Sequence, residues 1–118
     1  MIDWGRVVQL RDEVGAAEFG PLLELFLDEV EVVVMRLQAA DPAKLADDLH
    51  FIRGSAANLG FSGLAALCRD AETALARRMP QAVCLDRLRG CYARSKQIFL
   101  RDLAHAVGPD LIRDIGAA

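Results

Sequence analysis

Residues 41–60 read DPAKLADDLHFIRGSAANLG and carry the signals of one complete helix. Asp41 and Pro42 predict its start, because aspartate is a favoured N-cap residue and proline is tolerated at the first helical position. Gly60 predicts its end, since glycine readily adopts the left-handed conformation that closes many helices. Between these ends, apolar residues recur at the spacing of one buried helix face. They are Leu45, Leu49, Ile52, Ala56 and Leu59.

The same helical period places His50 on the opposite side of this helix. Successive residues turn by about 100°, so His50 lies about 140° from the centre of the apolar face and Arg53 about 80°. The imidazole is therefore predicted to point into solvent. Arg53 follows three residues later on the same side of the helix, within the distance at which side chains on neighbouring turns interact. Small residues form a patch next to the imidazole: Ala46, Gly54 and Ala57.

Gly54 lies about 180° from the apolar face. A glycine inside a helix costs about 1 kcal/mol relative to alanine, so its presence calls for a reason. Close packing of a second helix does not supply one, because Gly54 faces away from the predicted core. We favour the interpretation that Gly54 leaves room for a partner protein beside His50, over the alternative of a glycine without consequence. A histidine that accepts phosphate requires an exposed imidazole, a nearby cation and free space for a partner protein to reach the ring.

The run from His50 to Gly54 resembles the signature of histidine-containing phosphotransfer (HPt) domains, in which a basic residue and a glycine follow the phosphorylated histidine. The likeness extends over most of residues 3–104. It is carried further by Phe26, Leu27, Leu37, Asp41, Pro42, Ser55, Ala56, Asn58, Leu59, Gly60, Leu64, Leu67, Cys68 and Glu72. The family usually has lysine where this chain has Arg53. Arginine keeps the charge and can hold phosphate oxygens with two N–H groups.

This resemblance implies that His50 accepts a phosphoryl group from an aspartyl-phosphate receiver or hybrid histidine kinase and passes it to another receiver aspartate. Arg53 would support the charge of the phosphate, and Gly54 would give the receiver clearance. The expected partners are response-regulator receiver domains and a histidine kinase. No intrinsic cofactor is expected, because the receiver holds the Mg²⁺. Further contacts with the partner are expected from Ala46, Asp47, Ala57 and Asn58. The Asp47 carboxylate could also accept a hydrogen bond from the imidazole, or it is simply a solvated charge on the helix surface.

The helix predicted over residues 17–40 has an unusually wide apolar face. One stripe contains Leu22, Phe26, Val33 and Leu37, and a second beside it contains Leu23, Leu27 and Val34. Two interpretations stay open, and both can hold for different parts of the surface. In one, the first helix of the chain covers the extra apolar surface. In the other, the surface stays exposed beside His50 as a docking surface that includes Leu23 and Leu27.

Breaks in the helical pattern divide the chain into five helices. They are expected at about residues 3–14 after a cap at Asp3, at 17–40, at 41–60, from a cap at Ser62 to a point before Pro80, and at 81–106. Four long helices joined by short turns predict an all-α, antiparallel up-and-down four-helix bundle with an additional short N-terminal helix. Residues 1–118 are expected to form one domain with its core at about 17–106. The role of the tail, 108–118, is not evident from its pattern.

The composition excludes several classes of function. A net charge of −3 gives no basic surface for nucleic acid. Acidic residues interrupt the most apolar region, so no stretch reaches the roughly 20 residues needed to cross a membrane. The N-terminus lacks the pattern of a signal peptide, and we expect a cytoplasmic monomer. The 3 cysteines predict no disulfide framework, and Cys84 and Cys91 match a buried helical register. Without a glycine-rich phosphate loop, the chain is not expected to be a kinase.

Two other functions are alternatives to phosphotransfer. A helical adaptor would dock a receiver or kinase with the same surface but transfer no phosphate. A histidine-based metal or hydrolytic enzyme would need further ligands or a nucleophile–base pair, and the sequence suggests no metal site. The other histidine, His105, is near the end of the last predicted helix and lacks a following basic residue and glycine. The helix macrodipole explains an imidazole there without a role in phosphate transfer.

Overall fold

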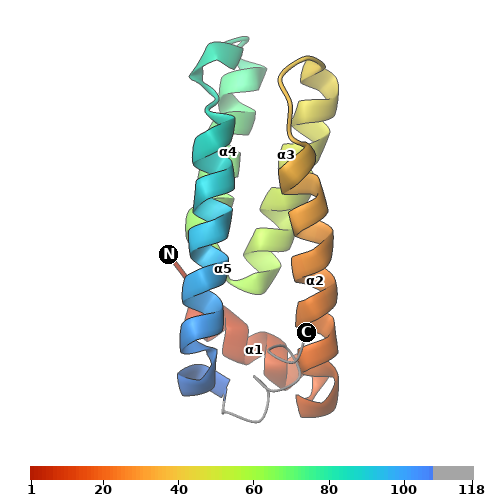
Figure 1. Cartoon of the computed structure of the whole chain (residues 1–118), viewed down its shortest axis with the longest axis vertical. Helices are drawn as coiled ribbons and strands as arrows, with labels where there is room; N and C mark the ends of the chain where they lie inside the picture. The colour runs from red at the N-terminus through yellow and green to blue at the C-terminus, as the bar shows by residue number, and fades with distance from the viewer. Residues whose placement is uncertain (108–118) are drawn as a thin grey trace.

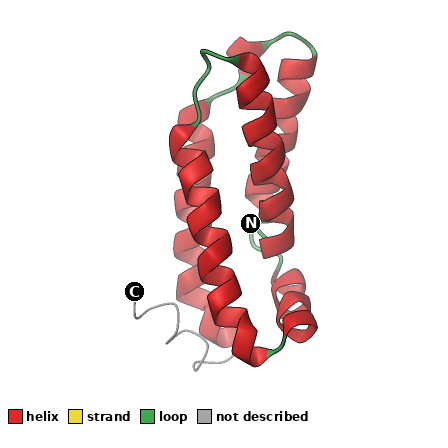
Figure 2. Cartoon of the chain, turned by 90° about the vertical axis from the view of Figure 1, so that its right-hand side faces the viewer, coloured by secondary structure: helices red, strands yellow, loops and turns green. Residues whose placement is uncertain are grey.

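The computed structural model describes residues 1–107, and its long helices pack side by side (Figures 1 and 2). The elements are α1 (Trp4–Val14), α2 (Ala16–Arg36), α3 (Pro42–Leu59), α4 (Ser62–Ala76), the short 3-10 helix η1 (Pro80–Ala82) and α5 (Leu85–Val107). Figure 1 shows α1 lying across one end of the bundle formed by α2, α3, α4 and α5. The predicted helical bundle with a short N-terminal helix is confirmed. The tail 108–118 lies outside the described residues.

Short-range signals set the ends of α1 and α3 as predicted. Asp3 accepts a hydrogen bond from the backbone N–H of Arg6 at 3.1 Å. Asp41 accepts one from the backbone N–H of Lys44 at 3.2 Å. Each aspartate thus satisfies one of the N–H groups that a helix start leaves without a partner. Gly60 closes α3 in the left-handed conformation, with φ 81° and ψ 15°.

Three predicted boundaries were wrong. Helix α2 ends at Arg36 rather than at residue 40, because the chain must turn before Asp41 caps α3. Ser62 is not a cap: it is the first residue of α4, and its hydroxyl donates to the carbonyl of Met1 at 2.9 Å. Helix α5 begins at Leu85 rather than at residue 81, since η1 and the residues after it make the connection from α4.

Most of the wide apolar face of α2 is buried. Helix α2 contacts α1, α3 and α5, which bury one apolar stripe completely and the other in part, with Leu22 and Phe26 partly buried. Leu23 and Leu27 have exposed fractions of 0% and 4%, so the hypothesis that they form a docking surface was wrong. Helical periodicity shows how wide an apolar face is, but it does not show how many neighbours cover it.

Aromatic contacts attach α1 to the end of the bundle. The indole of Trp4 stacks on Phe99 of α5, with ring centroids 5.6 Å apart. Phe61, in the turn between α3 and α4, meets the same ring edge-on at 5.2 Å. The backbone N–H of Asp3 also donates to the carbonyl of Gly60 at 2.7 Å. The N-terminal segment is therefore bound to the turn that joins α3 and α4.

The cysteines differ in exposure, and the prediction of a buried Cys84 was wrong. Cys68 is buried, Cys91 is partly buried and Cys84 is exposed in the connection before α5. All of them are free thiols. Burial raises the pKa of the Cys68 thiol to about 12, with a smaller contribution from the negative charge of Glu72.

We predict that Gly60→Ala lowers the free energy of unfolding by about 2 kcal/mol, because a left-handed backbone strains other residues. A Cβ atom there would also lie 2.6 Å from the carbonyl oxygen of Asp3. Urea unfolding followed by circular dichroism measures the change. Gly54→Ala is the control: a Cβ at Gly54 meets nothing within 4 Å, and alanine should add about 1 kcal/mol. An unchanged midpoint for Gly60→Ala contradicts the prediction.

We predict that thiol reagents modify Cys84 rapidly in the folded protein and reach Cys68 only after unfolding. The thiolate is the reactive form, and the raised pKa of Cys68 leaves very little thiolate at neutral pH. Alkylation at neutral pH, with and without urea, followed by peptide mass spectrometry gives the order of modification. Modification of both residues at similar rates in the folded protein would refute this prediction.

Candidate functional site

His50 lies in the middle of α3 with its side chain in solvent. The side chain is 74% exposed. Leu49 and Ile52, the nearest residues of the apolar stripe along the chain, are buried with exposed fractions of 0% and 1%. The rotation of α3 that the apolar spacing predicted is therefore confirmed, and the imidazole points away from the core.

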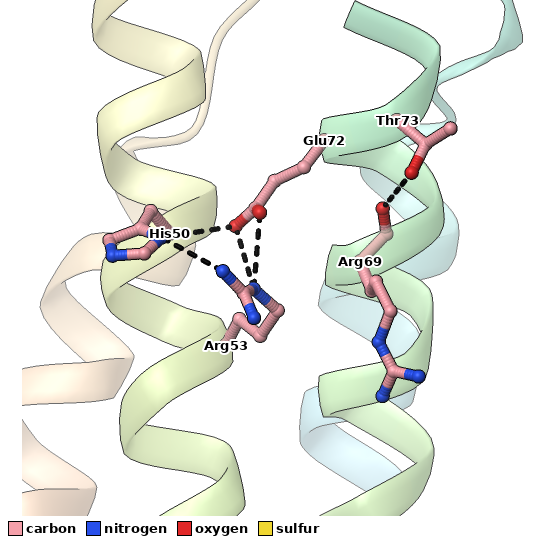
Figure 3. Close-up of polar contacts among 5 residues, drawn as sticks. All are labelled: His50, Arg53, Arg69, Glu72 and Thr73. Carbon is pink, nitrogen blue, oxygen red and sulfur yellow. Dashed lines mark hydrogen bonds and ion pairs between the residues drawn. The ribbon is translucent and has the colours of Figure 1, made fainter. Parts of the chain in front are cut away.

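One nitrogen of the imidazole faces two charged side chains (Figure 3). His50 Nδ1 lies 3.0 Å from Arg53 Nη2 and 3.8 Å from Glu72 Oε1. The first distance is that of a hydrogen bond, and the second is too long for one. Figure 3 shows the other ring nitrogen, Nε2, on the side of the ring away from Arg53 and Glu72. Nε2 is thus accessible to an incoming group from solvent, while Nδ1 contacts side chains of the protein itself.

Arg53 and Glu72 form an ion pair between α3 and α4. Arg53 Nε lies 3.1 Å from Glu72 Oε2 and 3.1 Å from Oε1. The two side chains are 36% and 22% exposed, so both charges are partly withdrawn from water. The pair holds the guanidinium directly beside the imidazole, and its remaining exposed surface can meet an anion that approaches His50.

The structure places the other predicted site residues of α3 around His50. Asp47, Gly54, Ala57 and Asn58 are exposed, and Ala46 is partly buried. Phe51 adds an apolar side chain that is 39% exposed, which the sequence analysis did not single out. We call the exposed residues Asp47, His50, Phe51, Gly54, Ala57 and Asn58 the outer face of α3.

Gly54 has open space where a side chain would be. A Cβ atom built there meets no atom within 4 Å outside its own helix. Packing within the described chain therefore does not require glycine at this position. An incoming protein can approach the backbone of α3 closely here, one turn from His50.

Glu72 is the site residue that the sequence analysis missed. It entered only as one position of the family resemblance, without a role. Of the two alternatives for Asp47, the structure supports the solvated surface charge: Asp47 is exposed, and within residues 1–107 it makes no hydrogen bond to His50, whose ring faces Glu72 instead. Glu72 is 19 residues after Arg53, so helical spacing alone does not bring the two together. Their contact depends on how α3 and α4 pack.

The remaining chemistry of the described chain offers no competing centre. His105 is exposed near the end of α5. Within residues 1–107, no group of three or more His, Cys, Asp and Glu side chains is arranged to hold a metal ion. Among the helices of this part of the chain, none combines the length and apolar character that crossing a membrane requires.

Comparison with known proteins adds an independent observation. Residues 21–108 match the Hpt domain family. Comparisons with curated proteins and with solved structures found no match. The matched range contains His50 and Arg53 on α3 and Glu72 on α4, and it includes α3, α4, α5 and most of α2. The chain therefore belongs to the Hpt domain family, whose members are histidine phosphotransfer modules of phosphorelays rather than autonomous kinases.

Proposed function

We propose that this protein is an intermediate of a multistep phosphorelay and that His50 carries the phosphoryl group. In this proposal the donor is an aspartyl-phosphate of a receiver domain or hybrid histidine kinase, and the acceptor is another receiver aspartate. The main support is the exposed imidazole in the middle of α3, with a guanidinium 3.0 Å from its Nδ1. The match of residues 21–108 to the Hpt domain family supports the same conclusion.

The transfer step needs only an imidazole lone pair from this chain. Nε2 attacks phosphorus, the bond between phosphorus and the aspartyl oxygen breaks, and its electron pair returns to the donor carboxylate. Arg53 offsets part of the negative charge that reaches the ring, because charge-assisted hydrogen bonds to phosphate are strong. In this proposal the Mg²⁺ belongs to the receiver, and the chain holds no cofactor of its own. Transfer to the next receiver reverses these bond changes.

The receiver is proposed to dock on the outer face of α3. Phe51 offers apolar contact area beside the imidazole. Asp47 and Asn58 offer exposed polar groups at the edges of this face. Gly54 lets the backbone of the receiver come close to α3, so that its aspartate can reach Nε2 of His50.

We predict that His50→Gln abolishes phosphorylation. The purified protein is mixed with radiolabelled, phosphorylated receiver domains, and acid-labile label on the chain is measured. His105→Gln serves as the matched control and should keep the label, because its ring has no described guanidinium contact like that of His50. Label that persists in His50→Gln would overturn the assignment. Receiver binding without label in any variant would favour the helical adaptor.

We predict that Gly54→Leu slows transfer from a phosphorylated receiver by about tenfold or more while the fold is kept. A leucine side chain would occupy the free space beside His50, and a loss of 1.4 kcal/mol in complex stability corresponds to about tenfold. Gly90→Leu is a matched control, since Gly90 is also an exposed helical glycine without a neighbour within 4 Å, but lies on α5. Equal transfer rates for both variants would argue against docking at Gly54.

A further inference from the structure

The contact between Arg53 and His50 specifies where the ring carries its hydrogen. A guanidinium has only donors, so Arg53 Nη2 donates to Nδ1 across 3.0 Å only when Nδ1 has a free lone pair. In a neutral imidazole the one hydrogen is then on Nε2. A ring nitrogen that carries hydrogen has no lone pair available to attack phosphorus. The arrangement around Nδ1 therefore leaves the exposed nitrogen without its nucleophilic lone pair.

Glu72 offers the opposite arrangement. Its Oε1 lies 3.8 Å from the same Nδ1, and a carboxylate only accepts. A hydrogen bond to Glu72 therefore requires hydrogen on Nδ1, which leaves the lone pair on Nε2. One ring nitrogen cannot accept from Arg53 and donate to Glu72 at the same time. The hydrogen bond to Arg53 and a hydrogen bond to Glu72, which would form only if the two side chains moved closer, require different tautomers of His50.

Arg53 contacts both the ring and the carboxylate that these tautomers involve. Its Nη2 contacts Nδ1, while its Nε holds the Glu72 carboxylate at 3.1 Å. The Arg53 side chain thus donates to Nδ1 of the ring and also binds the Glu72 carboxylate, the other group that could form a hydrogen bond with Nδ1. Lysine has a single charged nitrogen at the end of a flexible side chain, so it does not reproduce these two contacts from separate nitrogens.

We propose that Arg53 is a latch on the tautomer of His50, released by the arriving phosphoryl group. At rest, Arg53 keeps the hydrogen on Nε2. Phosphoryl oxygens draw the guanidinium away. Nδ1 then takes a proton from water and keeps it, donating a hydrogen bond to the Glu72 carboxylate, while Nε2 gives its proton to water. The P–N bond then forms at Nε2 as the P–O bond of the donor breaks, its electron pair going to the aspartate. The latch rests on the function proposed above, with Arg53 and Glu72 as positioning residues.

The latch predicts a change of tautomer in Arg53→Ala. Two-bond ¹H–¹⁵N spectra of the imidazoles, recorded at about pH 9 where histidine is neutral, distinguish the two tautomers. Wild-type His50 should carry hydrogen on Nε2. Arg53→Ala should shift the ratio toward Nδ1–H by about tenfold, because hydrogen bonds to charged groups are strong. Arg53→Ala with Glu72→Ala should return the ratio toward that of His105, the internal reference in every sample.

A second measurement tests the role of Glu72 in the reaction. Phosphoramidate, a small phosphodonor, labels His50 without any docked protein. Glu72→Ala should slow this labelling by about tenfold, since Nδ1–H loses its acceptor. Glu72→Gln keeps an acceptor oxygen and should restore most of the rate. Urea unfolding of each variant shows whether the fold is kept. The tautomer ratio of His50 in Arg53→Lys tests whether a positive charge alone is enough to keep the hydrogen on Nε2.

The outcomes separate the latch from the proposed function. The same tautomer ratio in wild type and Arg53→Ala, or Nδ1–H as the main wild-type form, overturns the latch. A double variant, Arg53→Ala with Glu72→Ala, that holds as much Nδ1–H as Arg53→Ala alone also overturns it. An Arg53→Lys ratio equal to wild type refutes the need for the guanidinium fork. If the tautomer shifts as expected but neither phosphoramidate nor receivers label His50, the proposed function fails while the control of the tautomer by Arg53 stands.

Discussion

Burial of the apolar stripe of α3 is the constraint on which the site depends. The four large side chains of this stripe are almost completely buried, and together they contribute on the order of 10 kcal/mol. They are Leu45, Leu49, Ile52 and Leu59. Turning α3 by one residue would expose part of this stripe and move His50 toward a neighbouring helix. The exposure of the imidazole is therefore fixed by the core on the other side of the helix.

A second constraint is the position of α3 along α4, because Arg53 and Glu72 meet only if the two helices are aligned. The turn between them sets this alignment. Gly60 makes a left-handed bend, and Phe61 is buried against Phe99 of α5. The N-terminal segment reinforces the turn, since Asp3 donates to Gly60 and the carbonyl of Met1 accepts from Gly63. The short first helix thus supports the geometry of a site far along the bundle from it.

The sequence predicted those features that depend on near neighbours along the chain. Capping residues and one apolar stripe located α3, and the same period placed His50 and Arg53 on its exposed side. The carboxylate beside the ring was not found, because Asp47 is close to His50 in sequence while Glu72 is close only across the α3–α4 interface. Leu23 and Leu27 were misassigned for a related reason. Three helices share the burial of α2, and periodicity within one helix contains no information about its neighbours.

The charges of the site explain why a carboxylate is compatible with a phosphate acceptor. Before transfer, Glu72 is neutralised by Arg53 across 3.1 Å. A phosphoryl group brings close to two further negative charges, and a bare carboxylate beside it would repel it. In the proposed loaded state, Arg53 turns toward the phosphate and the hydrogen on Nδ1 takes its place beside Glu72. The carboxylate then keeps a positive or polarised partner in both states, so the repulsion is limited. Replacement of Glu72 by an apolar residue would remove the repulsion but also the acceptor. Nothing on the protein would then favour the tautomer that attacks phosphorus once Arg53 has moved to the phosphate.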